Sequence, residues 1–527
     1  MSFHIASVGR TAARQAHLPI PTLVVTRNAS TSSAQAPSAL RRYLSLGAFV
    51  AGGTAFTLYY LDSRSALHRY GVMPLIRSGM DPEAGHKFAV KALASGFAPR
   101  DMAKDDEALA VELWGHRLAN PVGLAAGFDK DGEAIDGLFN LGFSWVEVGS
   151  VTPKPQEGNP KPRVFHLPED SAIINRYGFP SQGHAIVLSR LRSYVASHPP
   201  SAVTPSILAL NLGKNKSSAP DSTTDFLNGV AKFGPLVDVL VINVSSPNTA
   251  GLRALQGRGV LEELLSEVIK ARDALPKRST DEWKWEKAKI VVKIAPDLSA
   301  KEVEDIAEAV KVSGVDGVIV SNTTIQRPAE LKSINAVETG GLSGPPVKPL
   351  TLATLKTLRG HLPSSVPIIG CGGVSSGSDA VEYADAGATL VQLYTSFAYD
   401  GVGAPRRVKD EVSATLAARK TTWNDVVTSS VEKLSWRPKK PVDLFKDAQE
   451  ELKATLDEAG KRIALGDELV LLKEKVVEAV SVVKAPPLSA PLAGDVPATP
   501  VTGAHPEKSL KELIREAETA LGLPSSS

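Results

Sequence analysis

The sequence has little cysteine and little net charge. Cys371 is the only cysteine among 527 residues, which excludes an intramolecular disulfide and argues against a cysteine-rich metal site. We therefore expect no bound metal. The formal net charge is +2, so the composition gives no sign of general affinity for nucleic acid. Neither a GxGxxG dinucleotide fingerprint nor a P-loop motif precedes a predicted helix, which argues against an NAD-binding or nucleoside triphosphate-binding domain.

The first 61 residues contain no lysine, aspartate or glutamate. They carry arginines at positions 10, 14, 27, 41 and 42 and are rich in Ser, Thr and Ala. This composition is typical of a mitochondrial presequence, which we assign to residues 1–42. A secretory signal fits less well, because the arginines extend too far and the apolar run that follows lies too deep in the chain.

An uncharged apolar run follows the presequence. Residues 44–61 are rich in small side chains and end near Tyr59 and Tyr60, aromatic residues that favour a membrane interface. The run is at the short end of the roughly 17–25 residues that span a bilayer. We predict a single transmembrane helix at 43–61 in the inner mitochondrial membrane, in contact with its lipid, with the large domain that follows it facing the intermembrane space. A soluble matrix protein is the alternative.

A small helical segment is predicted at residues 70–98. From Pro82 onward apolar residues recur at helical spacing, and Asp81 with Pro82 supplies an N-cap and a first-turn proline. Two short amphipathic helices after a membrane span either pack on the following domain or form a vestibule for an apolar substrate. The local pattern alone favours packing.

Between residues 105 and 425 short apolar runs alternate with helical pattern, as at 300–312. Eight units of this kind match an α/β fold of the closed (β/α)₈ TIM-barrel type better than an open doubly wound sheet. The long interval 152–205 predicts an insertion after the second strand. The expected strands are 121–125, 145–149, 207–212, 239–244, 290–294, 317–320, 367–370 and 390–394.

The most informative motif follows the fourth of these strands. Asn243 and Asn248 flank Ser246 where the strand ends and a loop begins. Amides both donate and accept hydrogen bonds, so they suit a planar imide, and the hydroxyl between them is placed to exchange a proton. A polar turn without chemistry is an equally good interpretation of this motif taken alone.

Other strand ends carry complementary chemistry. Lys130 follows small residues that let a flat ring approach the backbone, and Lys293 stands in an otherwise apolar strand, where it is costly to bury unless an anionic group meets it. Gly344 and the pair Gly372-Gly373 form glycine-rich loops near the last two strands, the usual phosphate site of this fold. A mononucleotide such as FMN therefore fits better than NAD.

Ten motifs together resemble the class 2 dihydroorotate dehydrogenases, the membrane-associated, quinone-linked form of mitochondria. They occur in the family's order between about Val72 and Ala418. They read AAGFDK, EVGSVTPKPQEGNPKPR, INRYGF, NLGKNK, NVSSPNTAGLR, VKIAPDL, SNTT, GGLSG, GCGGVSSG and VQLYT. The resemblance implies oxidation of dihydroorotate to orotate with ubiquinone as acceptor, in the synthesis of UMP.

The resemblance also implies roles for individual residues. It implies that Ser246 abstracts the C5 proton and that Lys293 favours the reduced flavin. A serine hydroxyl is a poor base near neutral pH and needs a relay to solvent, for which Thr249 is our candidate. The implied FMN contacts are Ala125, Ala126, Gly127, Ser150, Asn175, Asn211, Asn243, Lys293 and Ser321, with the phosphate on Gly344, Gly373, Tyr394 and Thr395. The implied substrate contacts are Lys130, Asn175, Arg176, Asn243, Asn248, Asn322 and Thr323, with Tyr177, Gly178 and Phe179 closing over the substrate.

The class assignment depends on Ser246, because soluble class 1 relatives have a catalytic cysteine there. Cys371 is accordingly expected to be a packed residue rather than a nucleophile. The resemblance reverses the preference for simple packing at 70–98, which becomes a ubiquinone tunnel lined by His86. Two residues depart from the family pattern: Pro180 follows Phe179 where Asn is expected, and His166 replaces an expected Arg near the quinone path.

Residues 426–527 form an extension that the family does not require. Amphipathic pattern recurs at 444–459, 469–483 and 509–521, with a Pro- and Ala-rich linker at 486–506. The extension is either a helical, partly disordered tail for a protein partner or self-association, or a tolerated addition without function.

Two rival functions remain for the whole chain: another FMN barrel enzyme, such as a 2-hydroxyacid oxidase or dihydrouridine synthase, and a non-enzymatic scaffold.

Overall fold

The computed structural model describes residues 39–249, 251–437 and 453. The chain divides into two units, Met1–Arg437 and Pro438–Ser527, and the first contains every helix and strand described below. Most of the predicted presequence and the predicted tail helices between 444 and 521 lie outside the described residues.

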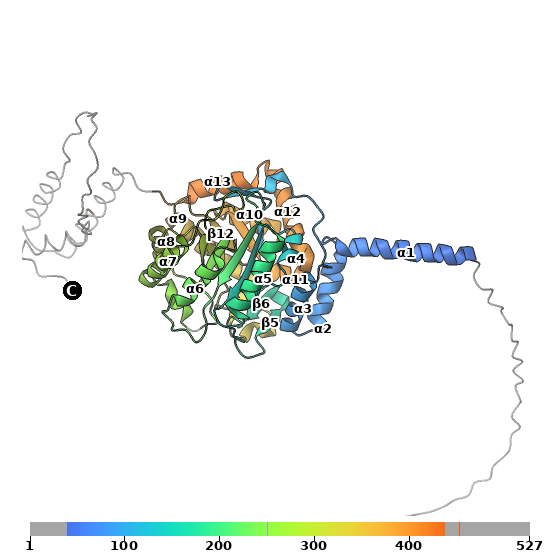
Figure 1. The fold of residues 1–527 in the computed structure, drawn as a ribbon, viewed down its shortest axis with the longest axis horizontal. Helices are drawn as coiled ribbons and strands as arrows, with labels where there is room; N and C mark the ends of the chain where they lie inside the picture. Colours follow the sequence, from blue (N-terminus) through green and yellow to red (C-terminus); the bar gives the residue numbers. More distant parts are fainter. Residues whose placement is uncertain (1–38, 250, 438–452, 454–527) are drawn as a thin grey trace, which may run out of the picture. The chain divides into compact units, whose positions relative to one another are not determined.

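Eight parallel strands close into a barrel (Figure 1). Each is a short apolar run whose side chains are buried on both faces, as in a strand enclosed between a barrel interior and covering helices. The strands, in barrel order, are β3 (Val122–Leu124), β4 (Trp145–Val151), β7 (Ile207–Leu212), β8 (Val239–Asn243), β9 (Lys289–Ile294), β10 (Gly317–Val320), β12 (Ile368–Cys371) and β13 (Leu390–Leu393). All eight predicted strands are confirmed, with ends that differ by no more than two residues.

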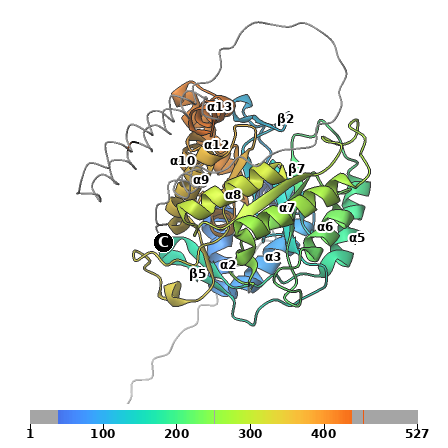
Figure 2. The ribbon, with the colours of Figure 1, turned by 90° about the vertical axis from the view of Figure 1, so that its left-hand side faces the viewer.

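Helices cover the barrel from outside. Figure 2 shows α5, α6, α7 and α8 following one another around it. The capping box of Ser299 and Glu302 starts α8, and Gly314 ends it with a φ of 70°. The covering helices are α4 (Ile135–Asn140), α5 (Gly183–Ser197), α6 (Thr224–Phe233), α7 (Arg258–Asp273), α8 (Ala300–Ser313), α9 (Lys348–His361), α10 (Gly377–Asp385), α11 (Thr395–Asp400) and α12 (Ala404–Arg419).

A further helix, α13 (Trp423–Leu434), packs on α9 and α10. Its Trp423 is fully buried, and the indole N–H donates to the carbonyl of Thr389 at 2.9 Å. The expected end of the barrel domain at residue 425 therefore falls inside a helix that belongs to the barrel unit.

The N-terminal segment is helical from Ala39. Helix α1 (Ala39–Leu61) contains the one stretch among the described residues, Leu40–Leu61, that is long and apolar enough to cross a membrane. After a π-helical turn at His68–Val72 come α2 (Met73–Gly79) and α3 (Pro82–Ala94). Asp81 caps α3 as predicted, because its carboxylate accepts from the backbone N–H groups of Glu83 and Ala84.

Two small sheets complete the fold. The hairpin β1 (Val111–Leu113) and β2 (His116–Leu118) lies at the amino ends of the strands, where the Trp114 indole donates to the carbonyl of Asp316 just before β10. The insertion after β4 forms β5 (Val164–Leu167) and β6 (Ala172–Asn175), and β11 (Gly341–Ser343) pairs with β6. This sheet brings Asn175 to the carboxyl end of the barrel.

Candidate active site

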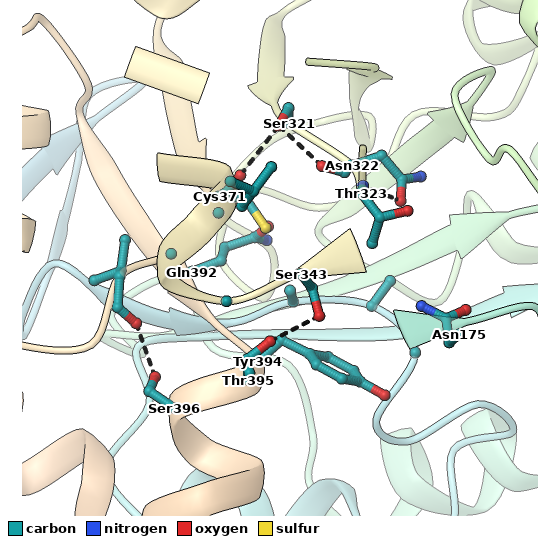
Figure 3. Close-up of a pocket in the computed structure, with 18 of the residues that line it drawn as sticks. Asn175, Ser321, Asn322, Thr323, Ser343, Cys371, Gln392, Tyr394, Thr395 and Ser396 are labelled. Carbon is teal, nitrogen blue, oxygen red and sulfur yellow. Dashed lines mark hydrogen bonds between the residues drawn. The ribbon is translucent and has the colours of Figure 1, made fainter. Parts of the chain in front are cut away.

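A cavity of about 370 Å³ opens at the carboxyl ends of the barrel strands. Figure 3 shows Asn322 and Thr323 on one side of it and Ser343, Tyr394 and Thr395 on another. The predicted site residues that line it are Ala125, Ala126, Gly127, Lys130, Ser150, Asn175, Tyr177, Gly178, Phe179, Asn243, Ser246, Asn248, Lys293, Ser321, Asn322, Thr323, Gly344, Gly373, Tyr394 and Thr395.

Two of the residues predicted to contact FMN or the substrate do not line this cavity. Asn211 lies behind its wall, where its side-chain oxygen accepts from Ser150 and from Asn243. Arg176 points elsewhere: its guanidinium donates to Glu338 at 2.6 Å and lies over the ring of Phe165. The predicted substrate contact of Arg176 therefore has no geometric support, and its ion pair instead holds the β6 end to the loop before β11.

Linked amides surround Ser246. Asn243 accepts from the Ser245 hydroxyl at 3.1 Å and from the Asn322 amide at 3.3 Å. Asn248 donates to the carbonyl of Asn175 at 3.2 Å. These contacts fix the amide planes before any ligand enters, and they leave Ser246 facing the cavity between them.

Two threonine hydroxyls near this group are buried without a partner. Among the described residues, Thr249 Oγ1 and Thr323 Oγ1 have no hydrogen-bond partner. A buried unpaired hydroxyl is costly, so such groups usually await a ligand or water. Thr323 lines the cavity, and Thr249 lies three residues after Ser246.

A buried ionic network lies under the cavity floor. Lys293 Nζ is 3.6 Å from Glu147 Oε1, and neither side chain is more than 5% exposed. Glu147 also accepts from the amides of Asn211 at 2.7 Å and Gln392 at 2.6 Å. Glu147 is the anionic group that the strand lysine required. Sequence reasoning missed Glu147 and Gln392, although an acid in the apolar run WVEVGSV is a visible signal.

Lys130 and His86 form a second polar group at the cavity edge. The Lys130 ammonium donates to the carbonyl of Gly127 at 2.7 Å and lies over the ring of Tyr177. Burial lowers the pKa of Lys130 to about 7. Burial, followed by the charge of Lys130, lowers the pKa of His86 to about 3, so its imidazole is neutral. The carbonyl of Phe128 can only accept, so His86 Nε2 carries the proton and Nδ1 faces Tyr177.

On another wall of the cavity, glycines leave the backbone without side chains. Gly344 has a φ of 102°, and a Cβ there would lie 2.8 Å from the carbonyl oxygen of Ser171. At Gly373 a Cβ would lie 2.7 Å from Cβ of Lys348. Nearby, Thr395 donates to the Ser343 hydroxyl at 2.9 Å. This wall of close backbone and hydroxyls fits a phosphate group, which is the role predicted for Gly344 and Gly373.

A second, mostly apolar cavity of about 310 Å³ adjoins the first. It lies between α2, α3 and the barrel, and both cavities are lined by Asn175, Tyr177 and Tyr394. Its polar lining includes His86 and His166. Burial, followed by the charge of nearby Arg77, lowers the pKa of His166.

Arg77 also lines this second cavity, and its guanidinium donates to the carbonyl of Tyr399 at 2.5 Å. Arg77 therefore places a cation near His166, although position 166 itself is not the arginine expected from the family pattern. Pro180, the other departure from the pattern, lines the first cavity directly after Phe179, which has a φ of 53°.

Comparison with known proteins identifies the family. Residues 108–416 match the family model described as Dihydroorotate dehydrogenase. The chain belongs to the dihydroorotate dehydrogenase family. This confirms the family expected from the ten motifs, and membership implies a flavin cofactor.

Similar proteins agree with this assignment. The chain is 47% identical over 410 residues to a protein of Schizosaccharomyces pombe named dihydroorotate dehydrogenase (quinone), mitochondrial, covering 72% of this chain and 89% of that relative. A mouse protein of the same name is 48% identical, covering 72% and 94%. A crystal structure of the Eimeria tenella dihydroorotate dehydrogenase with ferulenol superposes with a TM-score of 0.63 at 39% identity, covering 67% of this chain and 98% of that one.

Proposed function

We propose that this chain oxidises (S)-dihydroorotate to orotate, with FMN as cofactor and ubiquinone as electron acceptor, in pyrimidine biosynthesis. The observation that carries the proposal is one cavity in which Ser246 and four asparagine amides face a glycine-lined wall. The amides suit the pyrimidine ring of dihydroorotate, and the wall suits a phosphate. A 2-hydroxyacid oxidase or a dihydrouridine synthase has less support, because neither calls for this set of amides around a serine.

The residues present fit FMN. Small residues Ala125, Ala126 and Gly127 let a flat ring lie against the backbone, and Gly344 and Gly373 leave room for its phosphate. The Lys293 ammonium lines the same cavity and would face the pyrimidine edge of the flavin, where negative charge collects on reduction. When bound, FMN supplies the acceptor for hydride from C6 of dihydroorotate.

The chain's own residues bind the substrate and move its proton. Lys130 attracts the substrate carboxylate, while Asn248 and Asn322 hold the ring amides. Ser246 takes the proton from C5. A serine hydroxyl is a weak base near neutral pH, so it needs an acceptor for that proton. The unpaired hydroxyl of Thr249 supports a relay role for this residue.

The second cavity suits a quinone. Its apolar lining from α2 and α3 can hold the ring and the start of an isoprenoid tail, and its shared wall with the first cavity gives the ring access to the cofactor. Helix α1 and the mitochondrial relatives support association with a mitochondrial membrane. We assign this membrane to the inner mitochondrial membrane, with a cleavable presequence at 1–42, a span at 43–61, a tunnel domain at 70–98 and the catalytic domain facing the intermembrane space.

The test is dihydroorotate-dependent reduction of a ubiquinone analogue by the purified chain, with Ser246→Ala alongside. We expect activity in the wild type and a loss of about 100-fold or more in the variant, the usual contribution of a general base. Flavin reduction that passes electrons to fumarate or NAD⁺ but not to quinone would contradict the quinone assignment. A purified protein without bound flavin would instead favour a scaffold.

The tail at 426–527 is tested separately, by deleting residues 438–527 so that α13 stays intact. A change in oligomeric mass or membrane recovery supports a docking role for the tail, and no change supports a tolerated addition.

A further inference from the structure

Arg253, Asp297 and Thr324 are motif residues that have no role in the function proposed so far. Arg253 ends the motif that carries Ser246, Asp297 belongs to VKIAPDL, and Thr324 ends SNTT. They follow β8, β9 and β10, which are consecutive neighbours in the barrel. The structure brings all three together beside the active-site cavity.

The Arg253 guanidinium joins three loops at once. Its Nε donates to the carbonyl of Ser245 at 3.1 Å, and its Nη2 donates to the carbonyl of Thr323 at 2.9 Å. Its Nη1 donates to the carboxylate of Asp297 at 2.8 Å. The Asp297 side chain is 8% exposed and that of Arg253 is 23% exposed, so water weakens this pair only in part.

Asp297 is itself held in place. Its carboxylate accepts from the hydroxyl of Thr324 and from the backbone N–H of Ile325. Thr324 also accepts from the N–H of Gln326 at 2.9 Å. The anchor of the guanidinium is thus fixed to the β10 loop, the same loop that carries Thr323.

The two carbonyls that accept from Arg253 belong to residues next to proposed active-site residues. Ser245 directly precedes Ser246, the proposed base, and Thr323 directly follows Asn322, a proposed substrate ligand. A guanidinium is planar and presents its donors in a fixed fork, so it sets the spacing and angle between the groups it bonds. A lysine ammonium cannot reach three separate acceptors with this geometry.

We propose that Arg253 is a positioning residue that fixes the Ser246 loop relative to the Asn322–Thr323 loop, so that base and substrate are aligned. The proposal rests on the proposed function. Misplacement of reacting groups by about 1 Å can cost about 100-fold in rate. Gly344 and Gly373, which form the proposed phosphate wall, are not among the residues that Arg253 contacts. Loss of the three Arg253 hydrogen bonds, which we call the Arg253 clamp, should therefore affect substrate alignment and leave cofactor binding intact.

The experiment compares Arg253→Lys with the wild-type holoenzyme. Flavin content and thermal unfolding are measured first, then the rate of flavin reduction by dihydroorotate in a stopped-flow spectrometer, and orotate binding from the flavin spectrum. We expect full flavin content, a reduction rate at saturating substrate at least 10-fold lower, and weaker orotate binding. Arg258→Lys is the matched control: Arg258 lies five residues away, its side chain is 54% exposed, and it should behave as wild type.

Two further variants separate alignment from folding. Asp297→Asn removes the anchoring charge with little change of shape, and we expect the same defect in smaller degree. In Arg253→Ala, added guanidinium should restore part of the reduction rate.

The proposal is overturned if Arg253→Lys reduces its flavin within twofold of the wild-type rate. It is also overturned if every rate loss matches a loss of flavin or folded protein, which is the result of a merely structural role. Wild-type flavin that dihydroorotate does not reduce overturns the proposed function, and the clamp with it. The two failures can be told apart. If the wild-type flavin is reduced normally and Arg253→Lys is unaffected, only the role of Arg253 is overturned.

Discussion

Lys293 and Glu147 form an ion pair inside the barrel, with 3.6 Å between Nζ and Oε1 and no more than 5% exposure of either side chain. A buried charge without a partner costs several kcal/mol, so each of these residues makes the other tolerable. Amides of Asn211 and Gln392 complete the hydrogen bonding of the carboxylate. The pair therefore places compensated charges directly under the proposed cofactor site.

Glu147→Gln should destabilise the protein, because it leaves the Lys293 charge buried and unbalanced and turns an amide donor toward other donors. We expect the free energy of unfolding to fall by about 3 kcal/mol, the usual cost of removing one partner of a buried pair. Chemical denaturation of the holoenzyme measures it. Glu107→Gln removes the exposed partner of Arg117 and should change little. Equal effects of the two variants would contradict this account of the buried pair.

Local pattern was enough to predict the barrel. Runs such as 207–212 and 239–244 are apolar and bounded by turns, and a parallel barrel buries such strands on both faces. The family motifs then placed most site residues on one cavity. Arg176 shares a motif with Asn175 and Tyr177 but does not line the cavity with them. Extended chain sends successive side chains to opposite faces, so a residue between two cavity residues points away.

The Glu147 and Arg253 contacts could not be predicted in the same way. Glu147 meets Lys293 across the barrel, and Arg253 meets Asp297 from a separate loop. The first pair depends on the register of β4 and β9, which are far apart in the sequence, and the second depends on how the loops after β8 and β9 approach each other. Single-residue chemistry shows that a buried lysine needs an acid, but it does not show which acid the fold brings to it.

Gly344→Ala should weaken flavin retention. The backbone at this position has a φ of 102°, and a Cβ would lie 2.8 Å from the Ser171 carbonyl oxygen, so the loop must shift and the backbone around the proposed phosphate changes. Strain of this kind costs about 1–3 kcal/mol. The flavin-to-protein ratio after dialysis measures the loss. Gly360→Ala is the control, because nothing lies within 4 Å of a Cβ there and alanine favours helix α9. Flavin retention that is equal in both variants would contradict the phosphate assignment.

Orotate binding should weaken as the pH rises through about 7. Burial lowers the pKa of Lys130 to about 7, so above that pH the unliganded protein increasingly presents a neutral amine to the carboxylate of orotate. Up to tenfold in affinity per pH unit is expected once the neutral form dominates. Titration of the flavin spectrum with orotate from pH 6 to pH 9 measures this change. Lys130→Met should bind weakly at every pH without this slope, whereas Lys91→Met, a change on the exposed face of α3, should keep it. The same slope in Lys130→Met would assign the titration to another group.

Ala89→Phe should obstruct the apolar cavity without disturbing the substrate site. Ala89 is a partly buried residue of α3 that lines the cavity between α2, α3 and the barrel, and it does not line the cavity that contains Ser246. A phenyl ring there occupies space proposed for the quinone, so we expect the KM for a ubiquinone analogue to rise about tenfold, equivalent to about 1.4 kcal/mol of lost binding. Flavin reduction by dihydroorotate should be unchanged in the stopped-flow spectrometer.

The matched control for Ala89→Phe is Ala94→Phe, at the exposed last residue of the same helix. It adds the same ring outside the cavity, so it should leave both half-reactions at wild-type rates. If Ala89→Phe slows flavin reduction and quinone reduction equally, the two cavities do not serve separate halves of the reaction. If only quinone reduction is slowed, the wall shared by Asn175, Tyr177 and Tyr394 is where electrons pass from the substrate side to the membrane side.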